Sequence, residues 1–421
     1  MVVIMDEKME IVDLFIQFNK YDLALETLQD ISEYQPTKEV FLKISKVYEY
    51  MKKYDESLYI LKSLIKKGED DPVIYFKIAT LYQKKKDIST CFEYLSLAIE
   101  KGYNSEYIFY YKGLIYEDQN KLGHALNYYD RSLRKNKSFI SSRYRKYLIY
   151  LKTNKYNECE EELRKMIKYN GDEYDGYHLL FTFLMNMKRS NEALDILNSA
   201  IEVLGKDTII MLDYAKYYMY INEYDKSIDI INSIPKDNIY YSDFSIVRAK
   251  IMASKGDYDE AIKILMEDGI YNEENSEIVY LIGMYSIKLK NYSMAERFLG
   301  FLNEVENSDS EFVWFGLYIL GYAIKAQDKE RSIEYFKKLD EKYKLLSISN
   351  PYEIRIMILR IMIMIELQQY DEAITYSEGI MKITTVDEVK ELNILAKELK
   401  NKRDIVEDEK IIEVVNSILE R

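Results

Sequence analysis

The stretch GDYDEAIKIL, residues 256–265, decides the fold because close variants of it recur along the chain. A polar turn and a tyrosine come first, an alanine follows three residues after the tyrosine, and large aliphatic residues continue beyond it. Related stretches are KYDLALETL at 20–28, KYDESLYIL at 53–61, EYDKSIDII at 223–231 and QYDEAITYS at 369–377. Such recurrence indicates that one structural unit is repeated.

The repeat has a constant length. The residues equivalent to Tyr258, here called the turn positions, are Tyr21, Tyr54, Ile88, Leu122, Tyr156, Ser190, Tyr224, Tyr258 and Tyr292, with a first interval of 33 residues and seven of 34. Three residues after each lies a small position: Ala24, Ser57, Cys91, Ala125, Cys159, Ala193, Ser227, Ala261 and Ala295. Four residues further lies a large position: Leu28, Leu61, Leu95, Tyr129, Leu163, Leu197, Ile231, Leu265 and Leu299.

This pattern predicts a pair of antiparallel helices in each unit. Apolar residues at helical spacing on both sides of a polar turn make each helix amphipathic, and two helices alone cannot bury such faces. Stacking on the next unit buries them. The small position is expected where two helices approach closely, and the large position is expected to fill the groove one turn later. The fold class is therefore all-α.

The unit resembles the tetratricopeptide repeat family. That family has a 34-residue helix–turn–helix with a small residue and an aromatic in its first helix and alanine early in its second. Here Ala79 lies nine residues before a turn position and Tyr82 lies six before it. The family's early tryptophan is replaced by Phe41, Tyr75, Phe109 and Tyr177, and Pro36 is the best match to its terminal proline. The resemblance implies a right-handed α-solenoid of stacked antiparallel helix pairs.

The spacing divides the chain into three parts. Residues 1–304 hold nine regularly phased repeats, and the first begins near residue 5, which leaves no room before it for a helix-turn-helix domain. Residues 305–382 hold two longer, divergent units, one with Ser332 and Phe336 and one with Tyr370 and Ala373, with longer helices or loops near 306–310 and 345–351. Residues 383–421 are expected to form capping helices that use Ile411, Ile412, Val415 and Ile418.

Composition excludes several classes of protein. A formal charge of −13 argues against a protein that coats nucleic acid or an anionic membrane. The apolar stretch 312–324 has 13 residues, too few to span a bilayer, so it and residues 354–367 are expected to be buried helices. With two cysteines and no secretory signal, the chain is expected to be cytoplasmic.

No motif points to catalysis, a cofactor or a metal. The 14 glycines form no phosphate-binding loop or nucleophile elbow. Cys91 and Cys159 occupy small positions, where a buried cysteine substitutes for alanine, and the isolated His124 and His178 cannot complete a zinc site with them. The acidic runs 160–162 and 407–409 are expected to be solvated helix surface. We therefore expect a non-enzymatic protein with no cofactor.

One segment carries an excess of positive charge. Residues 101–150 hold ten Lys and Arg against four Asp and Glu. Some of these cations fall where a second helix ends and suit the helix dipole. Others are candidates for an acidic partner segment, whereas nucleic acid is not expected. The cations in question are Arg131, Arg134, Lys135, Lys137, Arg143, Arg145 and Lys146.

The resemblance also implies a concave groove lined by the first helices. The residues twelve before each turn position form a first row, and those eight before it form a second row. Both rows would point into the groove, together with some of their neighbours. Such a lining suits a peptide with apolar and acidic side chains, although these side chains could instead pack on neighbouring helices. The second row carries no asparagine, so a heat-shock co-chaperone clamp is not expected. The candidate groove residues are Phe76, Lys77, Tyr110, Tyr111, Tyr144, Arg145, His178, Lys216, Tyr220, Lys250 and Tyr280.

The sequence favours a scaffold that binds a protein or peptide segment without inserting into a membrane. The alternative is a peptide-responsive signalling receptor of similar repeat architecture that controls an effector protein. An enzyme or enzyme accessory has the least support, because no further domain remains once the repeats are counted. The partner and the oligomeric state are left open by the residues alone.

Overall fold

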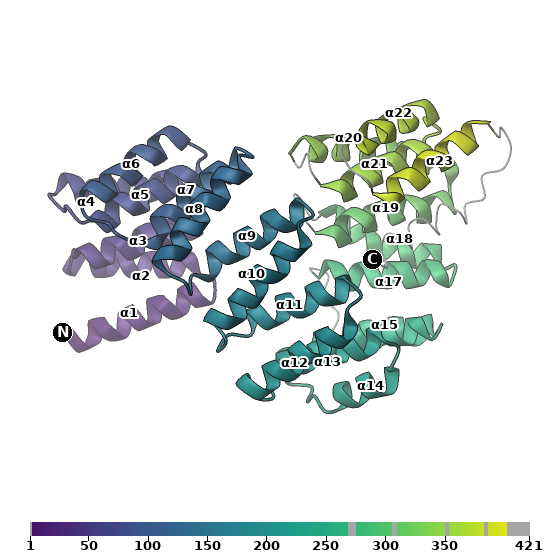
Figure 1. Cartoon of the computed structure of the whole chain (residues 1–421), viewed down its shortest axis with the longest axis horizontal. Helices are drawn as coiled ribbons and strands as arrows, with labels where there is room; N and C mark the ends of the chain where they lie inside the picture. Colours follow the sequence, from purple (N-terminus) through teal and green to yellow (C-terminus); the bar gives the residue numbers. More distant parts are fainter. Residues whose placement is uncertain (1, 268–274, 305–309, 350–352, 383–385, 402–421) are drawn as a thin grey trace. The chain divides into compact units, whose positions relative to one another are not determined.

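The computed structural model describes residues 2–267, 275–304, 310–349, 353–382 and 386–401. Over these residues the chain forms 23 α-helices, one 3-10 helix and no strand. The chain divides into two compact units, Met1–Leu180 and Phe181–Arg421, with the boundary inside α11 (Asp175–Asn186). Each unit is described by itself. The predicted all-α class of stacked helix pairs is confirmed (Figure 1).

The N-terminal unit contains ten helices before α11. Each odd-numbered helix is the first helix of a pair and each even-numbered helix is the second, and consecutive helices pack on each other. The helices are α1 (Val2–Gln17), α2 (Tyr21–Tyr34), α3 (Lys38–Tyr50), α4 (Tyr54–Lys66), α5 (Pro72–Lys84), α6 (Ile88–Glu100), α7 (Glu106–Asp118), α8 (Leu122–Lys135), α9 (Ile140–Lys152) and α10 (Tyr156–Tyr169).

The C-terminal unit continues the pattern after α11. From α15 onward its apolar core is one continuous cluster that extends to α23. The helices are α12 (Ser190–Leu204), α13 (Thr208–Tyr220), α14 (Tyr224–Asn232), α15 (Tyr241–Ser254), α16 (Tyr258–Leu265), α17 (Ser276–Lys288), α18 (Tyr292–Gly300), η1 (Phe301–Glu304), α19 (Glu311–Lys325), α20 (Lys329–Ser349), α21 (Ile354–Glu366), α22 (Tyr370–Met381) and α23 (Asp387–Asn401).

First helices of successive pairs also contact one another. α5 contacts α7 in the N-terminal unit, and α13 contacts α15, α17 contacts α19 and α19 contacts α21 in the C-terminal unit. Side chains on this face are therefore shared between solvent and the neighbouring first helix. The degree of that sharing decides which of them are available to a partner.

The small and large positions are buried as predicted. All nine residues at the small position have no exposed surface, and the nine residues at the large position are at most 2% exposed. Polar atoms at the small position find a partner on the first helix of the same pair. Ser57 Oγ donates to the Ser45 carbonyl at 2.8 Å and Ser227 Oγ donates to the Ala215 carbonyl at 2.7 Å. Serine is therefore accepted where alanine is usual.

Every turn of the regular repeats reverses the chain with a residue in the left-handed region two places before the turn position. Asparagine or lysine occupies it in eight pairs, at φ between 55° and 62°, as at Asn120 and Lys290. In the opening stretch the residue is Gly256, at φ 85°. The next residue, Asp257, donates its N–H to the Met252 carbonyl at 3.0 Å. This is a Schellman motif, which satisfies carbonyls that the first helix leaves open.

Glycines on the first helices make room for the largest residues of the second. A Cβ atom at Gly113 would lie 2.4 Å from the ring of Tyr129, and one at Gly283 would lie 2.3 Å from Leu299. Tyr129 is the aromatic exception among the large positions, and Gly113 stands directly against it. The two helices can therefore keep their close approach although the filling side chain is larger.

The later pairs depart from the regular unit in helix length. Helices α14, α16 and α18 have nine, eight and nine residues, whereas α20 has 21. α14 ends at Asn232, three residues before Pro235, which cannot continue a helix. The segment 345–349 belongs to α20 rather than to a loop. The proposed boundaries at residues 304 and 382 stay a prediction.

Two further expectations concern apolar segments. Residues 312–324 and most of 354–367 form the buried helices α19 and α21, as predicted. None of the helices among the described residues is long and apolar enough to cross a bilayer. The capping residues Ile411, Ile412, Val415 and Ile418 lie outside the described residues.

Alanine substitutions at two helical glycines test the packing rule. We expect Gly113→Ala to lower the free energy of unfolding by roughly 1–3 kcal/mol, because the new methyl group overlaps the buried Tyr129 ring. Gly123→Ala on the neighbouring α8 meets nothing within 4 Å. That variant should raise the unfolding free energy by up to about 1 kcal/mol. Urea unfolding followed by circular dichroism measures both, and equal effects would contradict the rule.

Candidate functional site

The eleven candidate groove residues all lie on first helices. Seven belong to the N-terminal unit and four to the C-terminal unit. The first group is Phe76 and Lys77 on α5, Tyr110 and Tyr111 on α7, Tyr144 and Arg145 on α9, and His178 on α11. The second is Lys216 and Tyr220 on α13, Lys250 on α15, and Tyr280 on α17.

Aromatic residues of the first group pack largely on one another. The Phe76 ring stacks on Tyr103 at 4.5 Å and meets the edge of Tyr111 at 5.4 Å. The Tyr110 ring meets Phe139 at 5.4 Å. Phe76 is only 8% exposed, so packing on neighbours describes it better than free groove lining. Sequence reasoning missed Tyr103 and Phe139 because both lie in the segments before first helices, outside the two rows.

Tyr144 and His178 are more accessible members of this group. Tyr144 is 39% exposed and its ring is tilted against Tyr147 at 6.1 Å. His178 is half-buried and tilted against Tyr174 at 6.1 Å. Tyr144 is therefore partly accessible on α9.

Arg145 is committed to an ion pair within the unit. Its guanidinium donates to Glu117, with Nε 3.0 Å from Oε2, and the Tyr129 hydroxyl donates to the same oxygen at 2.6 Å. Burial lowers and the Glu117 carboxylate raises the pKa of Arg145, and the net shift is upward. Arg145 thus links α9 to α7 rather than presenting a spare charge.

A buried ionic cluster contains two cations of the positive segment, Arg143 and Lys146. Glu162 on α10 is 3% exposed and accepts from Arg143 at 3.2 Å and from Lys146 at 2.8 Å. Lys146 also pairs with Asp130 at 2.7 Å. The expectation that Glu162 is solvated surface is wrong, because two buried cations surround it. In the run of three glutamates, residues 160–162, the sequence alone did not distinguish the buried Glu162 from its neighbours.

The remaining cations of that segment have mixed surroundings. Arg131 lies over the Phe109 ring at 5.3 Å, and Lys135 donates to Asn104. Arg134 and Lys137 are exposed at the surface. Three of the seven candidates for an acidic partner segment, Arg143, Arg145 and Lys146, are therefore engaged in intramolecular pairs.

Lys77 differs from the other candidate cations. It is half-buried on α5, and within the described part of the chain no carboxylate lies at ion-pair distance from its ammonium group. Burial lowers the pKa of Lys77, Glu49 opposes that shift and Lys46 adds to it. Glu49 itself pairs with Lys84 at 2.5 Å. Lys77 is thus a desolvated cation without a counter-charge among the described residues, a condition that it shares with Lys112 on α7.

Both lysines of the second group are paired. Lys250 lies 2.7 Å from Glu277 and Lys216 lies 3.7 Å from Asp213. Tyr220, at the end of α13, is 51% exposed. The C-terminal unit therefore offers a free aromatic ring here but no unpaired candidate cation.

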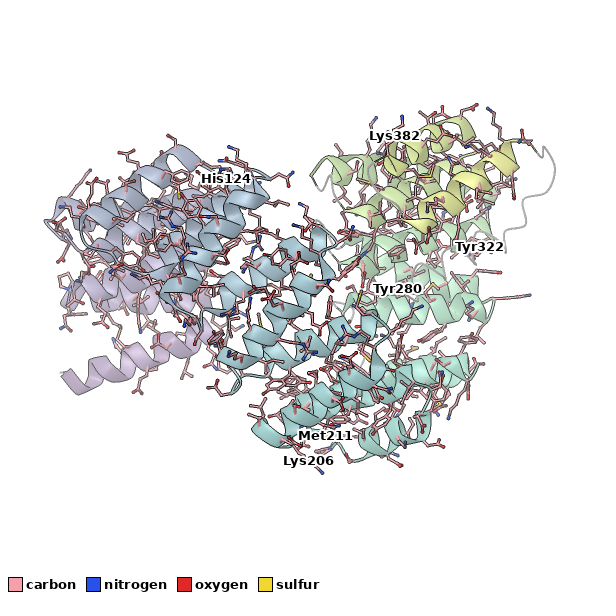
Figure 2. All side chains as sticks on the ribbon, in the orientation of Figure 1. His124, Lys206, Met211, Tyr280, Tyr322 and Lys382 are labelled. Atoms are coloured by element: carbon pink, nitrogen blue, oxygen red, sulfur yellow. The ribbon has the colours of Figure 1, made fainter. Side chains whose placement is uncertain are left out.

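Tyr280 lines an enclosed pocket of about 470 Å³ in the C-terminal unit. Figure 2 labels Tyr280 on α17, and the other walls come from α19, α21, Asn186 and the start of α23. Ile358 occupies the same register in its repeat as Tyr280 does, twelve residues before Tyr370, so extending the first row would have found it. The helix α19 follows the last regular interval of 34 residues, so counting back from a turn position could not locate its pocket residues. The lining residues are Asn186, Tyr280, Glu311, Phe312, Phe315, Ile354, Arg355, Ile358, Val386 and Glu388.

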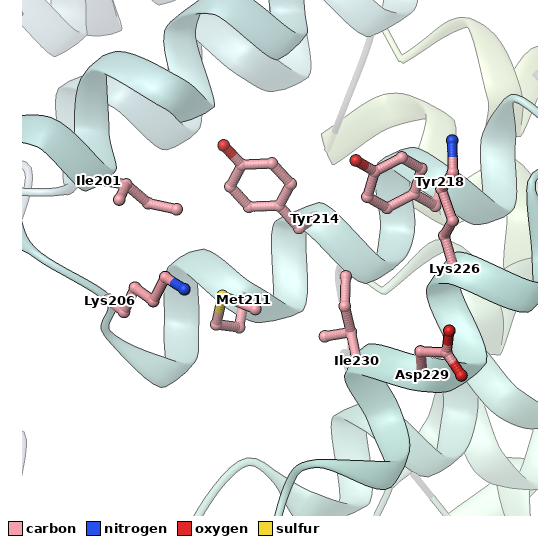
Figure 3. Close-up of a pocket in the computed structure, with 8 residues that line it drawn as sticks. All are labelled: Ile201, Lys206, Met211, Tyr214, Tyr218, Lys226, Asp229 and Ile230. Atoms are coloured by element: carbon pink, nitrogen blue, oxygen red, sulfur yellow. The ribbon is translucent and has the colours of Figure 1, made fainter.

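A second, shallower depression of about 390 Å³ lies between α12, α13 and α14 (Figure 3). Tyr214 and Tyr218 project from α13, and Lys226 and Asp229 come from α14. The Tyr214 hydroxyl donates to Asn198 at 2.6 Å. One polar group of this shallow depression is therefore already bonded within the protein.

The cysteines are inert, as their position predicted. Both are free and fully buried. Burial raises the pKa of the Cys91 thiol to about 12 and that of Cys159 to about 11. Over the residues that the structure covers, no group of three or more His, Cys, Asp or Glu side chains is arranged to hold a metal ion.

Three comparisons bear on this geometry. A family profile described as Tetratricopeptide repeat matches residues 39–67. The Bos taurus protein named BBSome complex member BBS4 is 27% identical over 117 residues, which cover 28% of this chain and 22% of that protein. The chain thus matches about a fifth of that relative's length. The crystal structure of yeast Tom70 is similar with a TM-score of 0.54 and 13% identity, over 97% of this chain and 98% of that one.

The fold and its repeated close contacts define a helical-repeat protein, in which each pair of helices is stabilised mainly by its neighbours. Within that class the 34-residue repeat and the family profile over residues 39–67 point to tetratricopeptide repeats, and the fold is that of a stack of such helix pairs. Such proteins mediate protein–protein interactions.

The buried cluster predicts a pH-dependent stability. Burial raises the pKa of Glu162, but hydrogen bonds and charge from Lys146 and Lys165 outweigh it, so the pKa is lowered. The cluster therefore stabilises the fold above the carboxyl's ordinary pKa of about 4.3 and loses this effect as pH falls through the lower folded value. We expect Glu162→Gln to cost about 3 kcal/mol of unfolding free energy at pH 7, and less in acid.

The neighbouring Glu161→Gln is the matched control for this prediction. Glu161 is exposed and pairs only with Lys165 on the surface, so its loss should change stability by less than about 0.5 kcal/mol. Urea midpoints at pH 7 and pH 3 measure both variants. A Glu162→Gln effect independent of pH would contradict the assignment.

Proposed function

We propose that this protein is a cytoplasmic, non-enzymatic scaffold whose N-terminal unit binds a peptide or protein segment on the face formed by its first helices. The bound segment would contribute acidic and apolar side chains. The observation that carries the proposal is Lys77, a half-buried cation without an acidic partner among the described residues. The two buried, unpaired cysteines fit a reducing compartment.

Desolvation explains why Lys77 favours an acidic ligand. Burying an ammonium group without a counter-charge costs free energy, and this cost is present in the unliganded protein. A carboxylate from a partner would offset it and form a charge-assisted hydrogen bond, worth about 1.5–3 kcal/mol. Lys46 on the neighbouring α3 is exposed and lies 5.5 Å from the Tyr50 ring centroid, which adds a second cation to the same surroundings.

Aromatic surface beside Lys77 supports the apolar part of the proposal. Tyr111 contacts the Phe76 ring, and Tyr107 and Tyr144 are exposed on the next two first helices. Tyrosines offer large contact area with little side-chain entropy to lose, which suits them to interfaces. A segment with a leucine or aromatic residue near an aspartate or glutamate would match both features.

The comparisons support a protein partner without naming one. The bovine relative is named as a member of a protein complex, although only a fifth of its length is matched. We infer from this likeness that the partner of the present chain is also a protein. Which protein it binds is left to the experiment.

Binding to a synthetic peptide array tests the proposal. The array holds twelve-residue peptides with a leucine and either aspartate, asparagine or lysine at one varied position. We expect the wild type to prefer the aspartate peptides, and Lys77→Gln to weaken their binding by roughly 10-fold to 100-fold. Fluorescence anisotropy measures the dissociation constants.

Lys85→Gln is the matched control, because it removes the same charge from the end of the same helix, where Lys85 already pairs with Asp55. It should leave binding within about twofold. Lys77→Gln should also raise the melting temperature of the free protein, since it removes a desolvated charge. Equal losses in both variants, or no preference for aspartate, would show that the proposal is wrong.

A further inference from the structure

The pocket is lined by the tyrosine Tyr280, whose hydroxyl makes no hydrogen bond to any of the described residues. Tyr280 is 6% exposed. Burial raises the pKa of this hydroxyl, so it is neutral and can both donate and accept. A ligand atom in the pocket could therefore form a hydrogen bond with this hydroxyl.

The walls of the pocket favour an aromatic group. The Tyr280 ring lies 5.6 Å from that of Phe312 at an interplanar angle of 47°. Phe315 and Ile358 complete an apolar floor, each at most 3% exposed. Aromatic rings prefer such surroundings because they interact favourably with other rings in tilted or offset arrangements. At about 470 Å³ the pocket falls in the range of sites that enclose small ligands.

The charges at the pocket disfavour an ionised ligand. Arg355 pairs with Glu311 across the wall and lies 3.6 Å from Glu353, so its charge is already balanced. Glu388 adds a negative charge to the lining. A carboxylate would therefore find no spare cation here, in contrast to the surroundings of Lys77.

We propose that this pocket binds an uncharged aromatic side chain of a partner segment, one that ends in a hydrogen-bonding group, as tyrosine does. The ring would lie against Phe312 and Phe315, and its polar end would meet the Tyr280 hydroxyl. This inference rests on the proposed function, because it assigns a second anchor for a peptide, in the C-terminal unit.

Short peptides test the anchor directly on the full chain. The probes are acetyl-Gly-Gly-X-Gly-Gly-amide with X as tyrosine, phenylalanine or aspartate. A saturation-transfer NMR titration measures their dissociation constants, and Trp314, the single tryptophan of the chain, lies beside Phe315 and gives an independent fluorescence signal. We expect the tyrosine peptide to bind most tightly and the aspartate peptide at least tenfold more weakly.

Three variants make the test specific. Tyr280→Phe should weaken the tyrosine peptide by about 2-fold to 12-fold, the equivalent of one hydrogen bond, and change the phenylalanine peptide by less than twofold. Ile354→Phe should weaken both peptides at least tenfold, because it fills the pocket. Tyr285→Phe, which removes another buried hydroxyl from α17 outside the pocket lining, should change neither.

The outcomes separate this inference from the proposed function. No binding of the tyrosine peptide, equal effects of Tyr280→Phe on both peptides, or unchanged binding by Ile354→Phe would each overturn the pocket assignment, while the preference for aspartate at Lys77 could still hold. Free N-acetyltyrosinamide is the second arm. Binding of the free amide as tightly as the pentapeptide would identify a small-molecule site and overturn the assignment to a partner segment.

Discussion

The close approach of two helices within each pair is the constraint on which the rest of the structure depends. At that contact the chain tolerates nothing larger than cysteine, and the side chain one turn later must fill the groove that the contact leaves. Where the filling residue is a tyrosine, at Tyr129, the opposing residue is Gly113. Shape complementarity is therefore settled inside each pair, and neighbouring pairs then share the remaining apolar faces.

Local determinants explain why so much of the fold could be predicted. The small and large positions and the turn all lie within a few residues of each other, so their spacing alone located the nine regular pairs. The buried charges were out of reach of that reasoning, since Glu162 and Arg145 have partners between 16 and 28 residues away. The exposure of side chains along the first helices could not be predicted either, because it depends on how closely each first helix packs against the next one.

Ion pairs connect successive pairs of helices throughout the N-terminal unit. Lys38 with Asp71, Glu49 with Lys84 and Asp70 with Lys101 each join residues about one repeat apart. At these junctions, charges of opposite sign from neighbouring repeats neutralise each other. Lys77 differs in being half-buried as well as unpaired within the described part of the chain. Functional sites are where local rules of pairing are commonly broken.

The restriction of contacts to neighbouring helices also bears on how the chain acquires its structure. Within each unit a helix contacts elements one or two places away in sequence, so closing each contact requires only a short loop and little loss of entropy. A newly made pair can dock as soon as the preceding pair has emerged from the ribosome. Folding can then keep pace with synthesis, and long-lived exposure of the apolar faces, which would invite aggregation, is avoided.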